Sequence, residues 1–281
     1  MKKPVNRVAI LHDLCGIGKA ALTNIMPIMS IMGIEPCPIP TLVLSTHTGG
    51  FGKPVIKGIP GFIDETTNHY KDNNIEFKGI FLGYLGNEDN ICSAINFIKK
   101  FRAENEIVLF DPICGDNGKL YSNFDEDYVN KLKSIIRLSD IITPNFTEAC
   151  YLANINEKDI SEIKDIKNLC IELSKLGSEN IIITSVPSIN AGDVSIAIYN
   201  SVTNYFNIIT HKKENKSYPG TGDIFASVLL SEIINKNDLE KSVIKAMDFV
   251  INCIKESSKY DYPTKEGVLL EKCLNKLLSD G

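Results

Sequence analysis

The feature that most constrains the fold is an alternation between short apolar runs rich in β-branched residues and longer amphipathic stretches. The apolar runs predict strands at residues 7–11, 39–44, 79–82, 106–110, 140–143, 180–184, 194–199 and 204–210. The amphipathic stretches predict helices at residues 19–32, 61–73, 88–101, 127–138, 147–152, 160–176, 223–235, 239–255 and 265–278. This alternation is typical of an α/β protein whose mostly parallel sheet is covered by helices on both faces.

The domain organisation follows from the same pattern. The predicted strands 194–199 and 204–210 follow one another without a helix between them, so we expect an antiparallel hairpin at one edge of the sheet. The 281 residues, 43% of them hydrophobic, contain no linker, low-complexity tract or repeat, which predicts a single domain over 1–281. In such sheets the site lies beyond the carboxyl ends of the strands, so the loops there are the candidates.

Charge and hydropathy exclude several classes of protein. The formal net charge is −5, and no general basic character indicates nucleic acid or an anionic membrane as a partner. The first apolar run, 8–11, is cut off by His12 and Asp13, which leaves it too short for a secretory signal. No stretch reaches the about 18 apolar residues that a membrane span requires. We expect a cytoplasmic protein.

The eight cysteines lie at least 20 residues apart, without a Cys-x-x-Cys pair or a Cys/His cluster. A structural zinc site is therefore not expected. Most of the cysteines lie in apolar runs, where a reduced thiol acts as a small hydrophobic side chain. Cys15 and Cys114 differ because they lie in glycine-rich loops.

A nucleotide-like motif near the N-terminus is a decoy. The run Gly16-Ile17-Gly18-Lys19-Ala20-Ala21 fits the dinucleotide fingerprint Gly-x-Gly-x-x-Ala, with Glu35 as a ribose ligand. In that fingerprint the glycines follow a strand directly, whereas here residues 12–15 intervene. A Walker A loop would need glycine in place of Asp13 and a hydroxyl residue in place of Ala20. We expect these glycines to allow close helix–strand packing.

The strongest signal for chemistry is the run Pro219-Gly220-Thr221-Gly222-Asp223, which an apolar helical stretch follows. Two glycines let backbone N–H groups turn toward one point, and the positive end of the helix adds to the attraction for an anion. A carboxylate in the first helical turn can accept a proton from a substrate hydroxyl. Phosphoryl transfer to an alcohol needs an anion site beside such a base. An aspartate that only caps the helix fits the same residues.

Three further loops at predicted strand ends carry polar groups. The loop 111–121 combines two acids with two glycines, the loop 143–149 supplies oxygens suited to hydrated Mg²⁺, and a Thr-Ser pair ends the next strand. The residues in question are Asp111, Asp116, Tyr121, Asn145, Glu148, Thr184 and Ser185. Each loop alone is compatible with turn chemistry. Together they would meet at one edge of the sheet.

These motifs, in this order, resemble the pyridoxal kinases of the ribokinase-like superfamily. The matching patterns are Asp-Pro-x-x-Gly-Asp-x-Gly-x-x-Tyr from residue 111, Thr-Pro-Asn-x-x-Glu-Ala from 143, Thr-Ser at 184 and Gly-Thr-Gly-Asp from 220. Ser-Thr-His-Thr-Gly at 45–49 and Gly-Tyr-Leu-Gly at 83–86 extend the similarity, which runs over residues 5–255. The resemblance implies a three-layer α/β/α sandwich and an ATP-dependent kinase that phosphorylates the 5′-hydroxymethyl group of pyridoxal, pyridoxine or pyridoxamine.

The resemblance also implies roles for individual residues. Asp223 would be the catalytic base, and the N–H groups of Gly220, Thr221 and Gly222 would bind the transferred phosphoryl group. Asp111, Asn145 and Glu148 would order Mg²⁺, and a monovalent cation such as K⁺ or Na⁺, around the ATP phosphates. The expected ATP contacts are Asp116, Tyr121, Asn145, Thr184, Ser185, Thr221 and Lys212. The vitamin ring would lie near Asp13, Thr48 and Tyr84.

Several alternatives remain open at this point. Lys212 and Lys213 fit a solvated face as well as a phosphate site, and His47 fits a loop hydrogen bond better than a catalytic role. The nearest rival function is hydroxymethylpyrimidine kinase of thiamine synthesis, a group that usually has cysteine in place of Asp223. A catalytically silent homologue is the other alternative, although Asp223 and Glu148 are both present. The resemblance also implies a homodimer.

Overall fold

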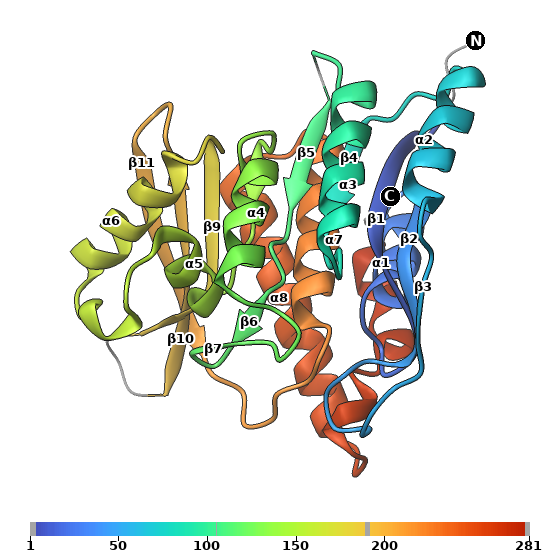
Figure 1. The fold of residues 1–281 in the computed structure, drawn as a ribbon. Coiled ribbons are helices and arrows are strands. Elements are labelled where there is room, and N and C mark those ends of the chain that lie inside the picture. Colours follow the sequence, from blue (N-terminus) through green and yellow to red (C-terminus); the bar gives the residue numbers. More distant parts are fainter. Residues whose placement is uncertain (1–3, 105, 189–191, 279–281) are drawn as a thin grey trace.

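The computed structural model describes residues 4–104, 106–188 and 192–278. Its centre is a nine-stranded sheet in the order β11-β10-β9-β8-β5-β4-β1-β2-β3 (Figure 1). The strands are β1 (Asn6–Ile17), β2 (Ile34–Thr46), β3 (Ile56–Gly58), β4 (Gly79–Leu82), β5 (Ile107–Phe110), β8 (Ile141–Ile142), β9 (Asn180–Pro187), β10 (Asp193–Asn200) and β11 (Tyr205–Lys212). A separate small ribbon pairs β6 (Gly115–Asp116) with β7 (Lys119–Leu120).

Most of the sheet is parallel. The six strands from β2 to β9 pair in parallel, whereas β3 at one edge and the β10–β11 hairpin at the other are antiparallel. The predicted α/β class, with its parallel centre and its antiparallel edge hairpin, is thereby confirmed. Because the parallel strands run the same way, their carboxyl ends gather the loops of the predicted site at one edge.

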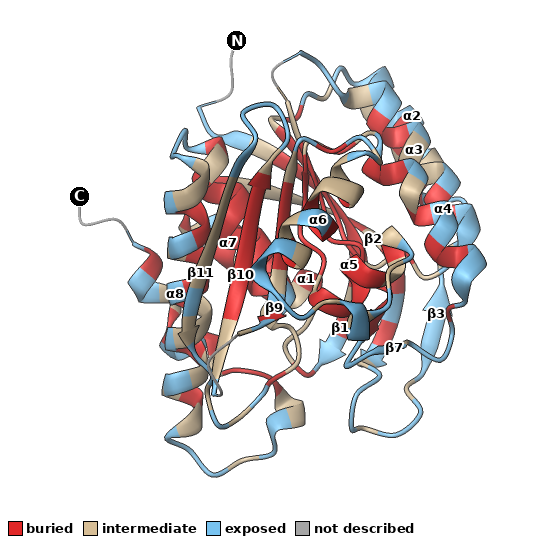
Figure 2. Cartoon of the chain, turned by 90° about the vertical axis from the view of Figure 1, so that its left-hand side faces the viewer, coloured by how far each residue is buried: buried red, intermediate tan, exposed pale blue. Residues whose placement is uncertain are grey.

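Helices cover both faces of the sheet, which makes the fold a three-layer sandwich. One face packs on α1 (Leu22–Ile31), α7 (Thr221–Ile234) and α8 (Leu239–Ser258). The other packs on α2 (Phe62–Asp72), α3 (Glu88–Phe101), α4 (Glu126–Ile136), α5 (Phe146–Ala153) and α6 (Ile163–Ser174). Figure 2 shows that the central strands are buried while the outer faces of α2, α3 and α4 are exposed. Within the described residues, no helix is long and apolar enough to cross a membrane.

The first strand is longer than expected. It was predicted to end at Leu11, but β1 continues to Ile17 and pairs with β2 as far as Thr46. The register shifts between His12 and Leu14. The prediction failed because His12 and Asp13 are polar, yet both are buried in this strand and hydrogen-bond each other.

The prediction of a helix at residues 265–278 is wrong. The chain there forms three short 3₁₀ turns, η2 (Thr264–Glu266), η3 (Leu270–Lys272) and η4 (Leu274–Leu277); a fourth, η1 (Glu157–Asp159), precedes α6. Gly267 breaks the segment with a φ of 78°, and a Cβ there would lie 2.5 Å from the carbonyl oxygen of Gly18. The segment therefore follows the surface of the Gly18 loop instead of continuing as a helix.

Candidate active site

The anion cradle is built by the start of α7. Its N-cap, Gly220, has φ 76° and ψ 6°, a left-handed conformation that favours glycine. A Cβ at Gly220 would lie 2.1 Å from the carbonyl oxygen of Lys19 and 2.6 Å from Nδ2 of Asn24. The helix proper begins at Thr221, so the N–H groups of Thr221 and Gly222 lie in the first turn, where a helix offers no internal acceptor. These groups are available to an anion.

Asp223 lies in the same turn, and its carboxylate is held on both oxygens. Oδ1 lies 3.1 Å from Nε2 of His12, and Oδ2 accepts a 2.6 Å hydrogen bond from the backbone N–H of Ala21. Ala21 reaches this position with φ 58° and ψ −139°, a conformation that a residue with a Cβ rarely adopts. Asp223 is buried, with 6% of its surface exposed.

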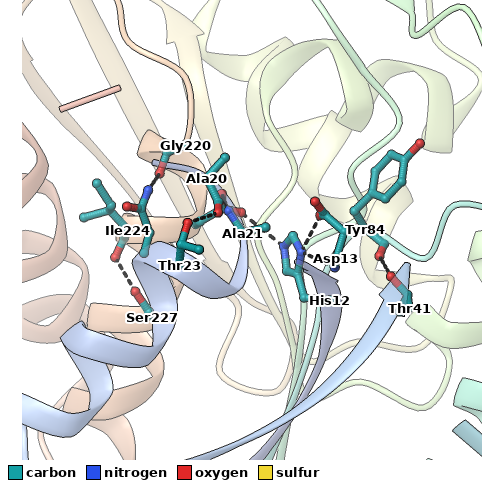
Figure 3. Close-up of polar contacts among 12 residues, drawn as sticks. His12, Asp13, Ala20, Ala21, Thr23, Thr41, Tyr84, Gly220, Ile224 and Ser227 are labelled. Carbon is teal, nitrogen blue, oxygen red and sulfur yellow. Dashed lines mark hydrogen bonds and ion pairs between the residues drawn. The ribbon is translucent and has the colours of Figure 1, made fainter. Parts of the chain in front are cut away.

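His12 connects Asp223 to Asp13. Its ring is 1% exposed, and its Nδ1 lies 2.9 Å from Oδ1 of Asp13 (Figure 3). Burial alone would lower the pKa of His12, but the hydrogen bonds and negative charges of Asp13 and Asp223 outweigh it and raise the pKa to about 10. The raised pKa favours the protonated ring, which would donate from Nδ1 to Asp13 and from Nε2 to Asp223. The backbone N–H of Asp13 also lies 2.9 Å from Nδ1, a contact in which only a neutral ring could accept.

Asp111 follows β5 and faces the first turn of α7. A Cβ built on Gly222 would lie 3.7 Å from its Oδ2. Burial, and then the charge of Asp223, raise the pKa of Asp111 to about 7, although the charge of His12 opposes this. Two neighbouring buried acids with one histidine leave negative charge that a bound cation would compensate. Asp111 therefore fits the expected metal-ordering role.

Asn145 and Glu148 form a capping box at the start of α5. The Asn145 side chain accepts from the N–H of Glu148 at 2.9 Å, and Oε2 of Glu148 accepts from the N–H of Asn145 at 2.8 Å. Oε1 accepts from the N–H groups of Cys114 and Gly115 at 3.1 and 3.5 Å, and Nδ2 of Asn145 donates to the carbonyl of Gly115. The pair thus fixes the loop after Asp111. Burial, and then the charge of Asp111, raise the pKa of Glu148 well above its ordinary value.

The expected ATP contacts lie close to this capping box, except for Thr221 at the start of α7 and Lys212 at the end of β11. Thr184 donates its N–H to the carbonyl of Pro144, and it lies with Ser185 in a bulge of β9 opposite a single residue of β10. Ser185 has a φ of 56°. Asp116 is exposed on β6, and Tyr121 donates its N–H to the carbonyl of Cys114. Lys212 is exposed at the end of the edge strand β11.

The residues expected around the vitamin ring are Asp13, Thr48 and Tyr84. Tyr84 is half-buried, stacks at a tilt on Phe124 with centroids 5.4 Å apart, and accepts a hydrogen bond at its hydroxyl from Asn123. Burial, and to a lesser extent the nearby charge of Asp13, raise the pKa of Tyr84. Figure 3 shows the Tyr84 and Asp13 side chains on the same side of His12. Thr48, by contrast, lies exposed in the loop after β2.

The structure assigns the decoy residues structural contacts. Cβ atoms at Gly16 and Gly18 would collide with Ser45 and His47, so these glycines allow close approach to the end of β2 and not to a helix. Glu35 pairs with Arg7 at the amino-terminal ends of β1 and β2, whereas the glycines lie at the carboxyl-terminal end of β1. His47 is a loop hydrogen-bonder as expected, with Nε2 2.6 Å from the carbonyl of Lys265.

Both cysteines in the glycine-rich loops are buried and reduced. Burial, followed by the charges of Asp13 and Asp223, raises the pKa of Cys15 to about 11, and its Sγ donates to the carbonyl of Ile17 at 3.0 Å. Burial, followed by the charge of Glu148, raises the pKa of Cys114. Neither thiol is a nucleophile at neutral pH.

Sequence reasoning missed His12, Ala21 and Gly83. A signal for His12 was present, because a His-Asp pair directly follows a buried strand, but it was interpreted as the strand's end. Gly83 matters because a Cβ there would lie 2.0 Å from Cδ2 of His12. The conformation of Ala21 has no local sequence signature.

The sequence profile described as phosphomethylpyrimidine kinase matches residues 36–267. That range contains the anion cradle and all three polar loops. The chain belongs to this kinase family. It is therefore a phosphotransferase, and relatives within the family show two kinds of named activity.

The chain is 30% identical to the pyridoxal kinase of Dictyostelium discoideum over 254 residues, which cover 84% of this chain and 82% of the relative. It is 29% identical to the hydroxymethylpyrimidine/phosphomethylpyrimidine kinase of Aquifex aeolicus, over 65% of this chain and 69% of that one. A Bacteroides thetaiotaomicron protein assigned to the same family is 36% identical and was solved in two crystal forms. One has a TM-score of 0.95 and covers 99% of this chain and 95% of its own, and the other, with pyridoxal, has a TM-score of 0.93 with 97% and 96% covered.

The cradle yields a first prediction. Gly220→Ala should lower the free energy of unfolding by about 2 kcal/mol or more, because it combines a left-handed φ with a backbone collision. Gly222→Ala is the matched control, since its φ is not positive and its nearest neighbour would lie 3.7 Å away. Urea unfolding of both variants measures the difference. Equal stability of the two would show that the tight turn at Gly220 is not required.

Proposed function

We propose that this kinase uses ATP and Mg²⁺ to phosphorylate the 5′-hydroxymethyl oxygen of a vitamin B6 pyridine. The observation that carries the proposal is the Asp223 carboxylate, fixed on both oxygens beside an open helix N-terminus and linked through His12 to Asp13. The Bacteroides thetaiotaomicron relative solved with pyridoxal and the pyridoxal kinase of Dictyostelium discoideum support this choice of substrate.

The chemistry follows from the arrangement. Asp223 accepts the proton of the substrate hydroxyl while the hydroxyl oxygen of the substrate forms a bond to the γ-phosphorus of ATP. The bond between that phosphorus and the oxygen bridging to the β-phosphate breaks, and ADP leaves. The N–H groups of Thr221 and Gly222, with the positive end of α7, stabilise the charge on the transferred group. The hydroxymethyl oxygen must therefore lie against the Asp223 carboxylate, with the transferred phosphoryl group at the N–H groups of Thr221 and Gly222.

Asp111 would hold the hydrated Mg²⁺ that accompanies ATP. Within the described ranges, no three His, Cys, Asp or Glu side chains form a metal site by themselves. That agrees with Mg²⁺, which uses one or two carboxylates together with water and substrate phosphates. Glu148 and Asn145 are engaged by backbone groups, so we assign them the shaping of the loop and contact to the ion through water. When bound, the ion neutralises phosphate charge, and a monovalent cation could add to this.

The nucleotide would lie over the loops at Asp116, Tyr121, Thr184 and Ser185. The bulge at Thr184–Ser185 supports this placement because it turns two polar residues out of a buried strand at the carboxyl edge. The position of Lys212, exposed at the end of the edge strand β11, gives less support to its proposed contact with the ATP phosphates. Thr48 would approach the ring only if its loop moved toward Tyr84.

The proposal includes a cytoplasmic homodimer. Four apolar side chains, Val43, Val55, Ile56 and Phe62, are 36–63% exposed on or beside the edge strand β3. A second copy of the chain would cover them and pair the open edge. Sedimentation velocity should give a dimer for the wild type, and Ile56→Lys should shift it toward monomer. A monomeric wild type at micromolar concentration would contradict the dimer.

Asp223→Asn tests the catalytic base. The change keeps the side-chain size but removes the proton acceptor, so turnover should fall by about 10²–10⁴-fold while ATP binding persists. Asp127→Asn is the matched control, because Asp127 also lies in the first turn of a helix, α4, but is exposed. Calorimetric ATP binding and steady-state turnover are measured on both. Near-normal turnover of the Asp223 variant would remove this residue from the chemistry.

Substrate identity is tested by ADP release across pyridoxal, pyridoxine, pyridoxamine and hydroxymethylpyrimidine. A B6 vitamer should have the higher kcat/KM, because its ring can stack on Tyr84 and its substituents can pair with pocket groups. One buried hydrogen bond is worth about 1–3 kcal/mol, or roughly 5- to 150-fold in discrimination. The carboxylate of Asp13 would favour the cationic amine of pyridoxamine among the vitamers. Preference for hydroxymethylpyrimidine would instead assign the chain the activity named for its Aquifex aeolicus relative.

A further inference from the structure

We propose that His12 is a positioning residue, which holds the catalytic base Asp223 and the pocket residue Asp13 in one fixed arrangement. The inference rests on the proposed function for its effect on catalysis, and on geometry for the arrangement itself. No motif of the family resemblance included His12. Its position on β1, between an acid of the same strand and an acid of α7, suggests the role.

The contacts leave the ring little freedom. Nδ1 and Nε2 lie 2.9 and 3.1 Å from carboxylate oxygens of Asp13 and Asp223, and the side chain is 1% exposed. Each ring nitrogen thus faces an acceptor. Rotation about the ring axis would break both contacts and leave two buried carboxylates without these partners, which is costly.

The surrounding chain makes room for this one orientation. Gly83 presents no Cβ, where one would lie 2.1 Å from Nε2 of His12, and Phe81 packs edge-on with ring centroids 6.1 Å apart. The β1–β2 register shifts at the same place, so that Thr41 and Leu42 of β2 stand opposite Asp13 alone. Side chains of adjacent strand residues ordinarily point to opposite faces, yet here those of His12 and Asp13 touch. The strand β1, its bulge and the space left by Gly83 together orient the His12 ring toward Asp223.

The second oxygen of Asp223 is held independently by a hydrogen bond from the N–H of Ala21, a residue with a strained backbone conformation. Two donors from different elements, β1 and the turn before α1, thus set the plane of the carboxylate. Loss of His12 would leave the carboxylate held at one oxygen and free to rotate about its terminal bond. Catalysis depends on such positioning because the productive geometry tolerates little error.

The charged groups near His12 are Asp13 on β1, Asp223 on α7 and Asp111 after β5. All are acids, so none of them opposes a positive ring. Because the pKa of His12 is raised from 6.5 to about 10, its ion pairs stabilise the fold fully below pH 6.5, and this contribution is lost as the pH rises through 10.

Three substitutions separate the two contacts. The amide nitrogen of glutamine can take the place of Nε2, and that of asparagine can take the place of Nδ1. His12→Gln therefore retains a donor toward Asp223, His12→Asn retains one toward Asp13, and His12→Phe retains only the packing on Phe81. If holding Asp223 matters, kcat should fall roughly 10- to 100-fold in the phenylalanine and asparagine variants and less in the glutamine variant.

The experiment measures kcat and KM for pyridoxal and ATP in all three variants, with His69→Gln on α2 as the control outside the site. We expect KM within about threefold of wild type, because the ring touches neither substrate in this arrangement. Equal kcat in wild type and the phenylalanine variant would overturn the proposal, as would identical losses in the glutamine and asparagine variants.

A second measurement does not depend on turnover or on the folding of any His12 variant. Ring-¹⁵N spectra of histidine-labelled wild type should show His12 protonated at pH 8. Its pKa should fall in Asp223→Asn and in Asp13→Asn, since each change removes a negative partner. A pKa of His12 that is unchanged in Asp223→Asn would overturn the proposal, because the ring would then not contact that carboxylate. Failure of the wild type to phosphorylate any vitamer, with these spectra as expected, would overturn the proposed function alone.

Discussion

The site depends on one histidine that joins two acids from opposite ends of the chain. His12 and Asp223 are 211 residues apart in sequence, yet their contact ties the first strand of the sheet to the first turn of α7. The hydrogen bond from Ala21 to Asp223 adds the start of α1 to the same point. The helix that provides the anion cradle, the strand that provides the pocket acid and the base between them are thus fixed by one small network.

The electrostatics of the edge follow from this network. Asp111, Asp223, Asp13 and Glu148 are all buried at the carboxyl ends of the strands, and His12 is the cation among them. Burial raises the pKa values of Asp111 and Glu148, which leaves a site that gains from an arriving Mg²⁺. Helix N-termini then favour the phosphates that accompany the ion. Binding of the nucleotide and its metal therefore compensates charge that the folded protein has already concentrated.

The sequence predicted the features that are determined locally. The bounds of α3 were predicted correctly because Asn87 caps a clean amphipathic run, and the start of α8 because Asp238 does the same. The Asn-x-x-Glu signature of the α5 capping box was also readable, although only its metal-binding interpretation was considered. Features that require a distant partner were lost: β1 was ended at Leu11 because buried His12 and Asp13 become acceptable only when Asp223 arrives from α7. The conformation of Ala21 and the turn at Gly267 likewise depend on tertiary contacts.

The most direct test of this account is a crystal structure with pyridoxal and a non-hydrolysable ATP analogue. We predict that the 5′-hydroxyl lies within about 3 Å of the Asp223 carboxylate, with His12 and Ala21 still bonded to it, and that the γ-phosphate faces the N–H groups of Thr221 and Gly222. A ring bound near Tyr84 with its hydroxymethyl group turned away from Asp223, or a γ-phosphate outside the first turn of α7, would contradict the account.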